Sequence, residues 1–485
     1  MGVMQGGMEL WAIVPEMTLG ILVLLLLPLG SYLPSARKFL TTTIALTGLG
    51  AAAVESCMMF SFRTQAIFIG TYAVDQFAVY FKLFAVVATA FVLLATESHF
   101  KGRPHAGEVP ALLLMTCLGI MALAASQNLA LIALFIQLVT VGSYILIGIA
   151  KESRLATEAA LKMFLFSAAV GAVMIYGMVL LFGLTGTLDL PQLAMKLPAM
   201  PVVTTIAAFC LVLVGYGFEV TLVPFHTWAP DAYQGAPTPI AGFLSVGPKA
   251  AGLAVLLRTL YVAFPHNLGH WAELIAVLAA VTMTVGNVFA LRQTSVKRLL
   301  AYSSIGQVGY LLVGVAAAQR SPFAIAGMLV YLTVYLFMNM GAFLAVDAIE
   351  RQVGSDDLMK FAGLGRRLPL SAGILAVCML ALAGFPPFGS FVGKVMLFNA
   401  ALDGGWTWLA VVMLLNIGLS LFYYARVLIP LYLHPSQAKP LQKEPQPLRF
   451  ALLLLGIGTV ISGILPQAWV AFAIHASSLL VPVSR

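Results

Sequence analysis

The chain of 485 residues is too apolar for a soluble protein, because 61% of its residues are hydrophobic and only 9% are charged, whereas soluble domains carry about 25% charged residues. Its net charge of +8 does not indicate a nucleic-acid-binding protein, because the basic residues lie in short connections between apolar runs. The composition therefore predicts an all-α polytopic membrane protein, since apolar runs of about 20 residues satisfy their backbone groups as spanning helices.

About fourteen apolar segments follow one another along the chain and predict the same number of transmembrane helices. They lie at residues 11–33, 40–62, 76–96, 109–126, 128–150, 157–183, 203–224, 237–263, 271–291, 297–318, 322–348, 370–400, 405–433 and 450–475. No connection between them is long enough for a soluble domain. Residues 1–485 are therefore predicted to form a single transmembrane domain.

The basic residues of the connections fall mainly on one side of the predicted membrane. That side carries sixteen: Arg37, Lys38, Lys101, Arg103, Lys151, Arg154, Arg292, Lys297, Arg298, Arg351, Lys360, Arg366, Arg367, Lys439, Lys443 and Arg449. The other side carries four: Arg63, Lys196, Arg320 and Arg485. Because positively charged loops stay in the cytoplasm, we expect both termini on the periplasmic side of a bacterial inner membrane.

Two segments contain prolines within the predicted helix. Segment seven ends at Pro224, and segment twelve contains Pro386 and Pro387. Proline removes a backbone donor and clashes with the preceding turn, so helices seven and twelve are predicted to break there. The two segments are five apart and therefore cross the membrane in opposite directions.

A pair of broken helices of opposite orientation is typical of transporters built from inverted repeats. We therefore expect two inverted five-helix repeats at 109–263 and 271–433, flanked by helices at 11–96 and 450–475. The alternative interpretation is two unrelated proline kinks.

Several charged residues lie inside these apolar segments, where each costs roughly 2.5–3.5 kcal/mol on insertion scales. Lys249 lies near the middle of segment eight among Gly, Ala and Ser residues, which leave room for water or a neighbouring helix. A buried amine there can hold and release a proton, and a structural ion pair is the alternative. Lys394 follows the second break, and Glu219 precedes Pro224 by five residues.

The remaining charged residues have interfacial interpretations. Lys162 follows Glu158 by four residues, so the two are predicted to pair on one helix face. Snorkelling of Lys162 to the interface is the alternative. Lys82 is predicted to snorkel or to pair with Asp75. Arg258 and Arg426 lie near segment ends, where an interfacial anchor is as good an interpretation as a functional group.

Three stretches resemble the antiporter-like membrane subunits of respiratory complex I. They are LVPFHTWAPDAYQGAPTP at 222–239, VKRLLAYSSI at 296–305 and GFPP at 384–387. The resemblance extends over essentially the whole chain and is greatest to the subunit N branch of bacterial NADH:quinone oxidoreductase. It implies fourteen helices, two inverted repeats and a polar axis of titratable residues along the membrane plane.

The resemblance also implies site residues. Lys162, Lys249 and Lys394 match lysines of the family, and Glu158 matches a glutamate. Two positions depart from it, since the family usually has glutamate where this chain has Gln137 and lysine where it has Glu219. We expect proton translocation through Lys162, Glu219, Lys249 and Lys394, with Glu219 titrating against Lys162. Glu158, Gln137 and His226 are expected to be supporting polar or ion-pairing groups.

The function implied is a proton-translocating, non-redox membrane subunit of a redox-driven NADH:quinone oxidoreductase. NADH, flavin, iron–sulfur clusters and quinone are then expected in partner subunits, and this chain is expected to contact other membrane-arm subunits, lipid and protons. It has no Walker A motif, no dinucleotide fingerprint and no Cys/His spacing typical of zinc or iron–sulfur sites. One alternative is a subunit of a multi-subunit cation/proton antiporter without redox input. The other is a structural subunit that only bridges its neighbours.

Overall fold

The computed structural model describes residues 10–34, 37–61, 64–265, 268–435 and 442–477. Within these ranges, twelve helices are long and apolar enough to cross a membrane, and two shorter apolar helices bring the number to fourteen. The prediction of an all-α polytopic membrane protein is therefore confirmed. In chain order the fourteen are α2 (Val14–Tyr32), α3 (Phe39–Met58), α4 (Gln76–His99), α5 (Val109–Ala125), α6 (Leu129–Ile147), α7 (Arg154–Thr185), α9 (Val202–Val220), α11 (Thr238–Ala263), α12 (Leu268–Ala290), α13 (Val296–Ala317), α14 (Ala324–Val353), α16 (Pro369–Ala383), α18 (Thr407–Leu433) and α19 (Gln446–Ile464).

Shorter elements connect or extend these helices. They are the α-helices α8 (Leu190–Lys196), α10 (Trp228–Gly235), α15 (Leu364–Arg367), α17 (Gly389–Asp403) and α20 (Pro466–Ser477), the 3₁₀ helices η2 (Met59–Ser61), η3 (Leu197–Ala199) and η5 (Leu358–Phe361), and the strands β1 (Gln65–Ile67) and β2 (Tyr72–Val74). The two strands form an antiparallel hairpin with Ala66 opposite Ala73, which the sequence analysis did not predict. The predicted segment 450–475 is also wrong as a single helix. It divides into α19 and α20 at Pro466, whose missing N–H cannot continue the helical hydrogen bonding.

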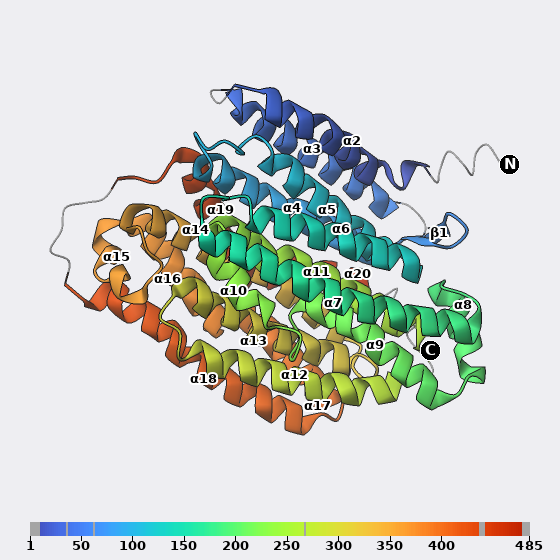
Figure 1. The fold of residues 1–485 in the computed structure, drawn as a ribbon. Helices are drawn as coiled ribbons and strands as arrows, with labels where there is room; N and C mark the ends of the chain where they lie inside the picture. Colours follow the sequence, from blue (N-terminus) through green and yellow to red (C-terminus); the bar gives the residue numbers. More distant parts are fainter. Residues whose placement is uncertain (1–9, 35–36, 62–63, 266–267, 436–441, 478–485) are drawn as a thin grey trace.

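The helices form one bundle in which α2 and α3 lie at one edge and α17 and α18 at the opposite edge (Figure 1). Three helices form its centre, since the most apolar 18-residue stretch is 100% buried in α11, 94% in α13 and 89% in α14. The outer helices instead expose large apolar side chains, among them Leu24, Val203 and Leu433. Such faces suit a bilayer, which solvates them without the cost that water imposes.

The two ends of the described chain lie at the same end of the bundle. Helix α2 begins beside the β1–β2 hairpin, because Ala12, Ile67 and Tyr72 share one apolar cluster. Phe472 of α20 packs against Phe60 and Tyr80 near the same hairpin, with ring centroids 5.6 and 5.7 Å away. An even number of crossings produces this arrangement.

Both predicted helix breaks are confirmed. Helix α9 ends at Val220 and is followed by Thr221 with φ +63° and by Pro224, before α10 begins at Trp228. Helix α16 ends at Ala383 and is followed by Gly384 with φ +93° and by Pro386 and Pro387, before α17 begins at Gly389. Glycine adopts a positive φ without penalty, whereas a residue with a side chain pays roughly 1–2 kcal/mol.

Candidate functional site

Lys249 lies in the middle of the almost entirely buried helix α11 and is 1% exposed. Its Nζ donates to Ser304 Oγ of α13 at 2.8 Å and lies 5.8 Å from the centre of the Tyr233 ring. Of the residues that the structure describes, no acidic side chain forms an ion pair with it. The structural ion pair that was the alternative for Lys249 is therefore absent among the described residues. The ammonium group is instead stabilised by a hydrogen bond to a hydroxyl and by a cation–π contact with an aromatic ring.

Glu219 is the second-last residue of α9, directly before the first break, and is 3% exposed. Its side chain rests against Gly252 of α11, where an added Cβ would lie 3.1 Å from Glu219 Cβ. Thr140 Oγ1 of α6 lies 3.5 Å from Glu219 Oε2, at the limit of a hydrogen bond. Gly252 lies three residues after Lys249, so Glu219 and Lys249 occupy neighbouring turns of one interface.

Glu219, which was expected to titrate against Lys162, forms no ion pair with it. Lys162 Nζ binds Glu158 Oε1 and Asp231 Oδ2, each at 2.8 Å, and its side chain is 49% exposed. The Glu158–Lys162 pair is thereby confirmed. Asp231 of α10 was missed as a partner, although it lies inside the 222–239 motif, because the fold alone brings it to α7.

Lys394 is held at the second break. Its Nζ donates to the carbonyl oxygens of Leu382 at 2.9 Å and Ala383 at 3.2 Å, and it lies 5.1 Å from the centre of the Tyr310 ring. Those carbonyls end α16, where the helix leaves its last acceptors unpaired and carries a partial negative charge. A lysine of α17 therefore caps the helix on the other side of the break.

A series of polar side chains occupies the centre between Lys249 and Lys394. Ser303 Oγ of α13 and Tyr424 OH of α18 are 2.5 Å apart, and Gln307 Nε2 of α13 donates to Tyr424 OH at 3.0 Å. Gln307 Nε2 also donates to the Leu382 carbonyl at 3.2 Å, which is the same oxygen that accepts from Lys394. This link was not predicted from the sequence, although Ser303, Ser304 and Gln307 are three polar residues within one apolar segment.

Two of the three predicted supporting residues, Gln137 and His226, lie beside this axis. Gln137 is half-buried on α6, one turn before Thr140, with its Nε2 2.8 Å from where a Cβ on Gly171 would lie. His226 is half-buried in the first break, and its Nδ1 has no hydrogen-bond partner among the described residues. Pro224 and the pair Pro386–Pro387 interrupt the helices without contributing a titratable group.

Two further charged residues differ from their predictions. Lys82 neither snorkels nor pairs with Asp75, since it is fully buried and binds Glu16 Oε1 at 2.8 Å. Arg258 is not an interfacial anchor, because it is 1% exposed and its NH1 and NH2 bind the two oxygens of Asp75 at 2.8 and 3.0 Å. Burial raises the pKa of Asp75, but the Arg258 guanidinium, the Ala78 N–H and the Lys82 charge together outweigh it, so the pKa of this carboxyl lies below its usual range.

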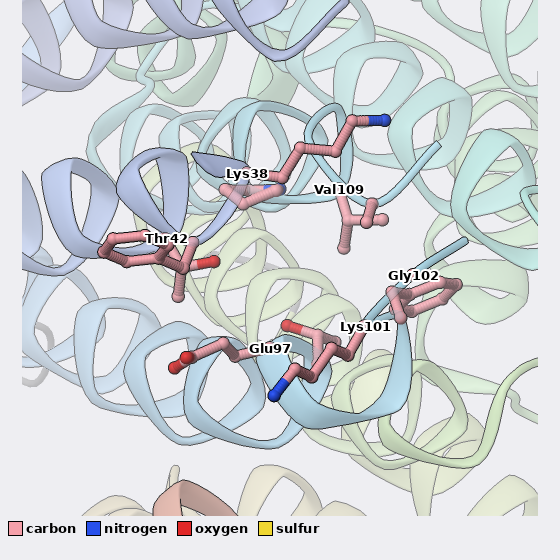
Figure 2. A pocket seen from close by; sticks show the side chains of 11 residues that line it. Lys38, Thr42, Glu97, Lys101, Gly102 and Val109 are labelled. Atoms are coloured by element: carbon pink, nitrogen blue, oxygen red, sulfur yellow. The ribbon is translucent and has the colours of Figure 1, made fainter. Parts of the chain in front are cut away.

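A pocket with a volume of about 270 Å³ lies away from this axis, between α3, α4 and the connection to α5. It is lined in part by Lys38, Thr42, Glu97 and Lys101 (Figure 2). Figure 2 shows the ammonium groups of Lys38 and Lys101 pointing away from each other, so they do not converge on one ligand. In the described ranges, no group of three His, Cys, Asp or Glu side chains has the arrangement of a metal site.

Comparisons with known proteins match the chain over most of its length. Residues 126–420 match the family model described as NADH:quinone oxidoreductase/Mrp antiporter, TM. NADH-quinone oxidoreductase subunit N of Trichlorobacter lovleyi is 36% identical over 96% of this chain and 97% of its own. F(420)H(2) dehydrogenase subunit N of Methanosarcina mazei is 35% identical over 98% of this chain and 99% of its own.

Solved structures have the same fold. A chain of respiratory complex I from Thermus thermophilus is similar with a TM-score of 0.80 and 30% identity, over 95% of this chain and 100% of that one. A chain of the Mrp complex from Dietzia sp. DQ12-45-1b has a TM-score of 0.85 at 21% identity, over 99% of this chain and 98% of that one. The second likeness concerns the fold alone.

Proposed function

The chain belongs to the NADH:quinone oxidoreductase/Mrp antiporter family of membrane proteins, and from that premise we propose that it is the proton-translocating subunit N of a redox-driven NADH:quinone oxidoreductase. NADH, flavin, iron–sulfur clusters and quinone are then bound by partner subunits, which supply the oxidation and reduction. The chain acts as the non-redox part of a translocase. Its own residues hold and pass protons.

The observation that carries the proposal is the burial of Lys249 without a carboxylate partner among the described residues. An unpaired ammonium group in a low-dielectric interior favours loss of its proton, and it regains the proton when a neighbouring charge changes. Ser304 Oγ is the group that accepts from it at 2.8 Å. Lys249 is therefore the central site that alternates between charged and neutral forms.

On either side of Lys249 lie the other titratable groups of the axis. Lys162 and Glu219 supply protons from the cytoplasmic side, since Lys162 is half exposed and Glu219 lies one turn from the central site. Lys394 receives them through the polar side chains of α13 and α18, among them Gln307 and Tyr424. Hydroxyls, amides and the waters they order form the hydrogen-bonded route that proton transfer requires.

The two halves of the axis correspond to the proposed inverted repeats, 109–263 and 271–433. Each proposed repeat contains one broken helix, and the two breaks have the same layout, with a helix end, a residue of positive φ and a proline in the same order. The flanking parts, 11–96 and 450–475, lie outside the repeats. Both termini are proposed to be periplasmic in a bacterial inner membrane, a placement supported by the sixteen basic residues of the opposite connections.

The proposal is tested by measuring protons moved per electron in membranes that contain the assembled complex. Lys249→Met is expected to abolish proton movement by this subunit, and Glu219→Gln to reduce it. Lys360→Gln serves as the control because Lys360 is an exposed lysine outside the helices of the axis. Normal stoichiometry in an assembled Lys249→Met complex would refute the central role of Lys249 and favour a structural subunit that only bridges its neighbours.

A cation/proton antiporter is the second candidate, because the description of the matching family model also includes the Mrp antiporter. It predicts sodium-dependent proton flux by the protein in liposomes without an electron donor. The redox-driven proposal predicts no such flux, and proton movement only when donor and quinone are both supplied.

A further inference from the structure

Asp231 joins the two halves of the molecule at the entrance of the axis. It lies on α10, the short helix after the first break, and binds Lys162 of α7 at 2.8 Å and Arg298 of α13 at 2.5 Å. Arg298 NH1 is also bound by Gln234 Oε1 at 3.1 Å. One carboxylate is therefore shared between a lysine of the first proposed repeat and an arginine of the second.

Asp231 and Lys394 occupy equivalent positions after the two helix breaks. Helices α9 and α16 each end four residues before a proline, at Val220 before Pro224 and at Ala383 before Pro387. Asp231 follows Pro224 by seven residues, and Lys394 follows Pro387 by seven residues. Asp231 thus occupies in the first half the place of Lys394 in the second, with the opposite charge.

The two acidic partners of Lys162 are unequal. Glu158 is 60% exposed and lies on the same helix, a type of pair worth about 0.3–0.5 kcal/mol. Asp231 is 32% exposed and comes from another element, where Arg298 holds its second oxygen. The position of the Asp231 carboxylate is therefore fixed by two cations, whereas the Glu158 carboxylate is solvent-exposed and has one cationic partner.

From this geometry we infer that Asp231 is a positioning residue for proton translocation: it holds the Lys162 ammonium group at the entrance and links its charge to the second half through Arg298. The inference rests on the proposed function. When Lys162 is charged, Asp231 is shared between two cations, and when Lys162 loses its proton, the carboxylate is left to Arg298 alone. Protonation of Lys162 thereby weakens the interaction of Asp231 with Arg298 on α13, the helix that also contains Ser304.

Few other charged groups lie on the elements packed around Lys162 and Asp231. Glu219 lies on α9 and Lys249 on α11, both buried in the axis. On α13 the neighbouring Lys297 binds Glu350 at 3.4 Å. None of these four charged groups forms an ion pair with Lys162 or Asp231 in the described part of the chain.

The test compares Asp231→Asn, Asp231→Glu and Glu158→Gln in the assembled complex, by protons per electron as a function of pH. Without the Asp231 charge, Lys162 holds its proton less tightly, so the alkaline limit of pumping in Asp231→Asn is expected at a pH lower by about one unit. Asp231→Glu is expected to restore the wild-type profile, and Glu158→Gln to leave it nearly unchanged. Arg298→Gln is expected to shift the limit in the opposite direction, because Asp231 is then left to Lys162.

A purely structural role gives a different result. Asp231→Asn would then lower the amount of assembled complex while the pH profile per complex stayed that of the wild type, and this outcome overturns the inference. Equal shifts for Asp231→Asn and Glu158→Gln also overturn it, since they would show no special role for α10. Lys249→Met measured alongside separates the two proposals: if it pumps normally, the proposed function fails, and if only the Asp231 variants behave as wild type, the inference alone fails.

Discussion

The buried pair of Glu16 and Lys82 allows a quantitative test of what the charges outside the axis contribute. Lys82 of α4 is fully buried and binds Glu16 of α2 at 2.8 Å, while Tyr72 OH donates to the same carboxylate oxygen at 2.7 Å. Neither residue lies in the proposed repeats. We therefore expect changes in this pair to alter stability and not the number of protons per electron.

The structure sets the size of the effect. Lys82→Met leaves the Glu16 carboxylate buried with only the Tyr72 hydroxyl, and breaking such a pair costs about 3–5 kcal/mol. Glu16→Gln leaves the Lys82 ammonium with the Ala12 carbonyl at 3.5 Å and Met59 Sδ at 3.6 Å, so a similar loss is expected. In the double variant no charge is left unpaired, and its stability is expected within about 1 kcal/mol of the wild type.

The assay is the apparent free energy of unfolding of the four proteins, from SDS titration of the detergent-purified chain. A coupling energy of at least about 2 kcal/mol between the two sites is expected. If the losses of the single variants simply add in the double variant, the pair is not a coupled ion pair and the reasoning is refuted. Thr18→Ala on α2 serves as the control, since its only described side-chain bond is to Glu55.

Three further predictions concern the axis and its breaks. Gly252→Ala is expected to displace Glu219 and to impair pumping without removing a titratable group, because the new Cβ would lie 2.6 Å from Val220 Cγ1 and 3.1 Å from Glu219 Cβ. The measurement is the proton-to-electron ratio, and Gly418→Ala is the control because a Cβ there would contact no other atom. Thr221→Gly is expected to raise the free energy of unfolding by about 1 kcal/mol, because φ +63° disfavours threonine, and an unchanged or lower value in SDS titration contradicts it. Lys394→Met is expected to lower the free energy of unfolding by about 1–3 kcal/mol, since the Ala383 carbonyl loses its described donor. The same variant is expected to stop pumping, whereas Lys394→Arg is expected to recover the stability.

The features that could be predicted from the sequence are those that depend on local constraints. The bilayer fixes the length of a spanning helix, so α4 and α11 begin and end within a few residues of the predicted segments. Proline acts on its own helix, which is why the breaks at Pro224 and Pro387 were predictable. The same holds for Glu158 and Lys162, which are one turn apart.

The partners that were missed are distant in the sequence. Glu16 lies on α2 and Lys82 on α4, and Asp75 meets Arg258 only because α4 packs on α11. No spacing rule identifies such pairs, since they depend on which helices become neighbours. Asp231 is the same case at the candidate site, because α10 reaches α7 and α13 only after the chain has turned at the first break.

The position of Lys394 between α16 and α17 has a mechanical consequence. Its ammonium group joins α17 to the last carbonyls of α16 across five intervening residues of non-helical chain, 384–388. A neutral amine makes hydrogen bonds roughly half as strong as those of an ammonium group, so the proton on Lys394 fastens the two half-helices together. If translocation removes this proton, as proposed, the connection between α16 and α17 weakens, and the charge state of one side chain changes the stiffness of the helix bundle in the membrane.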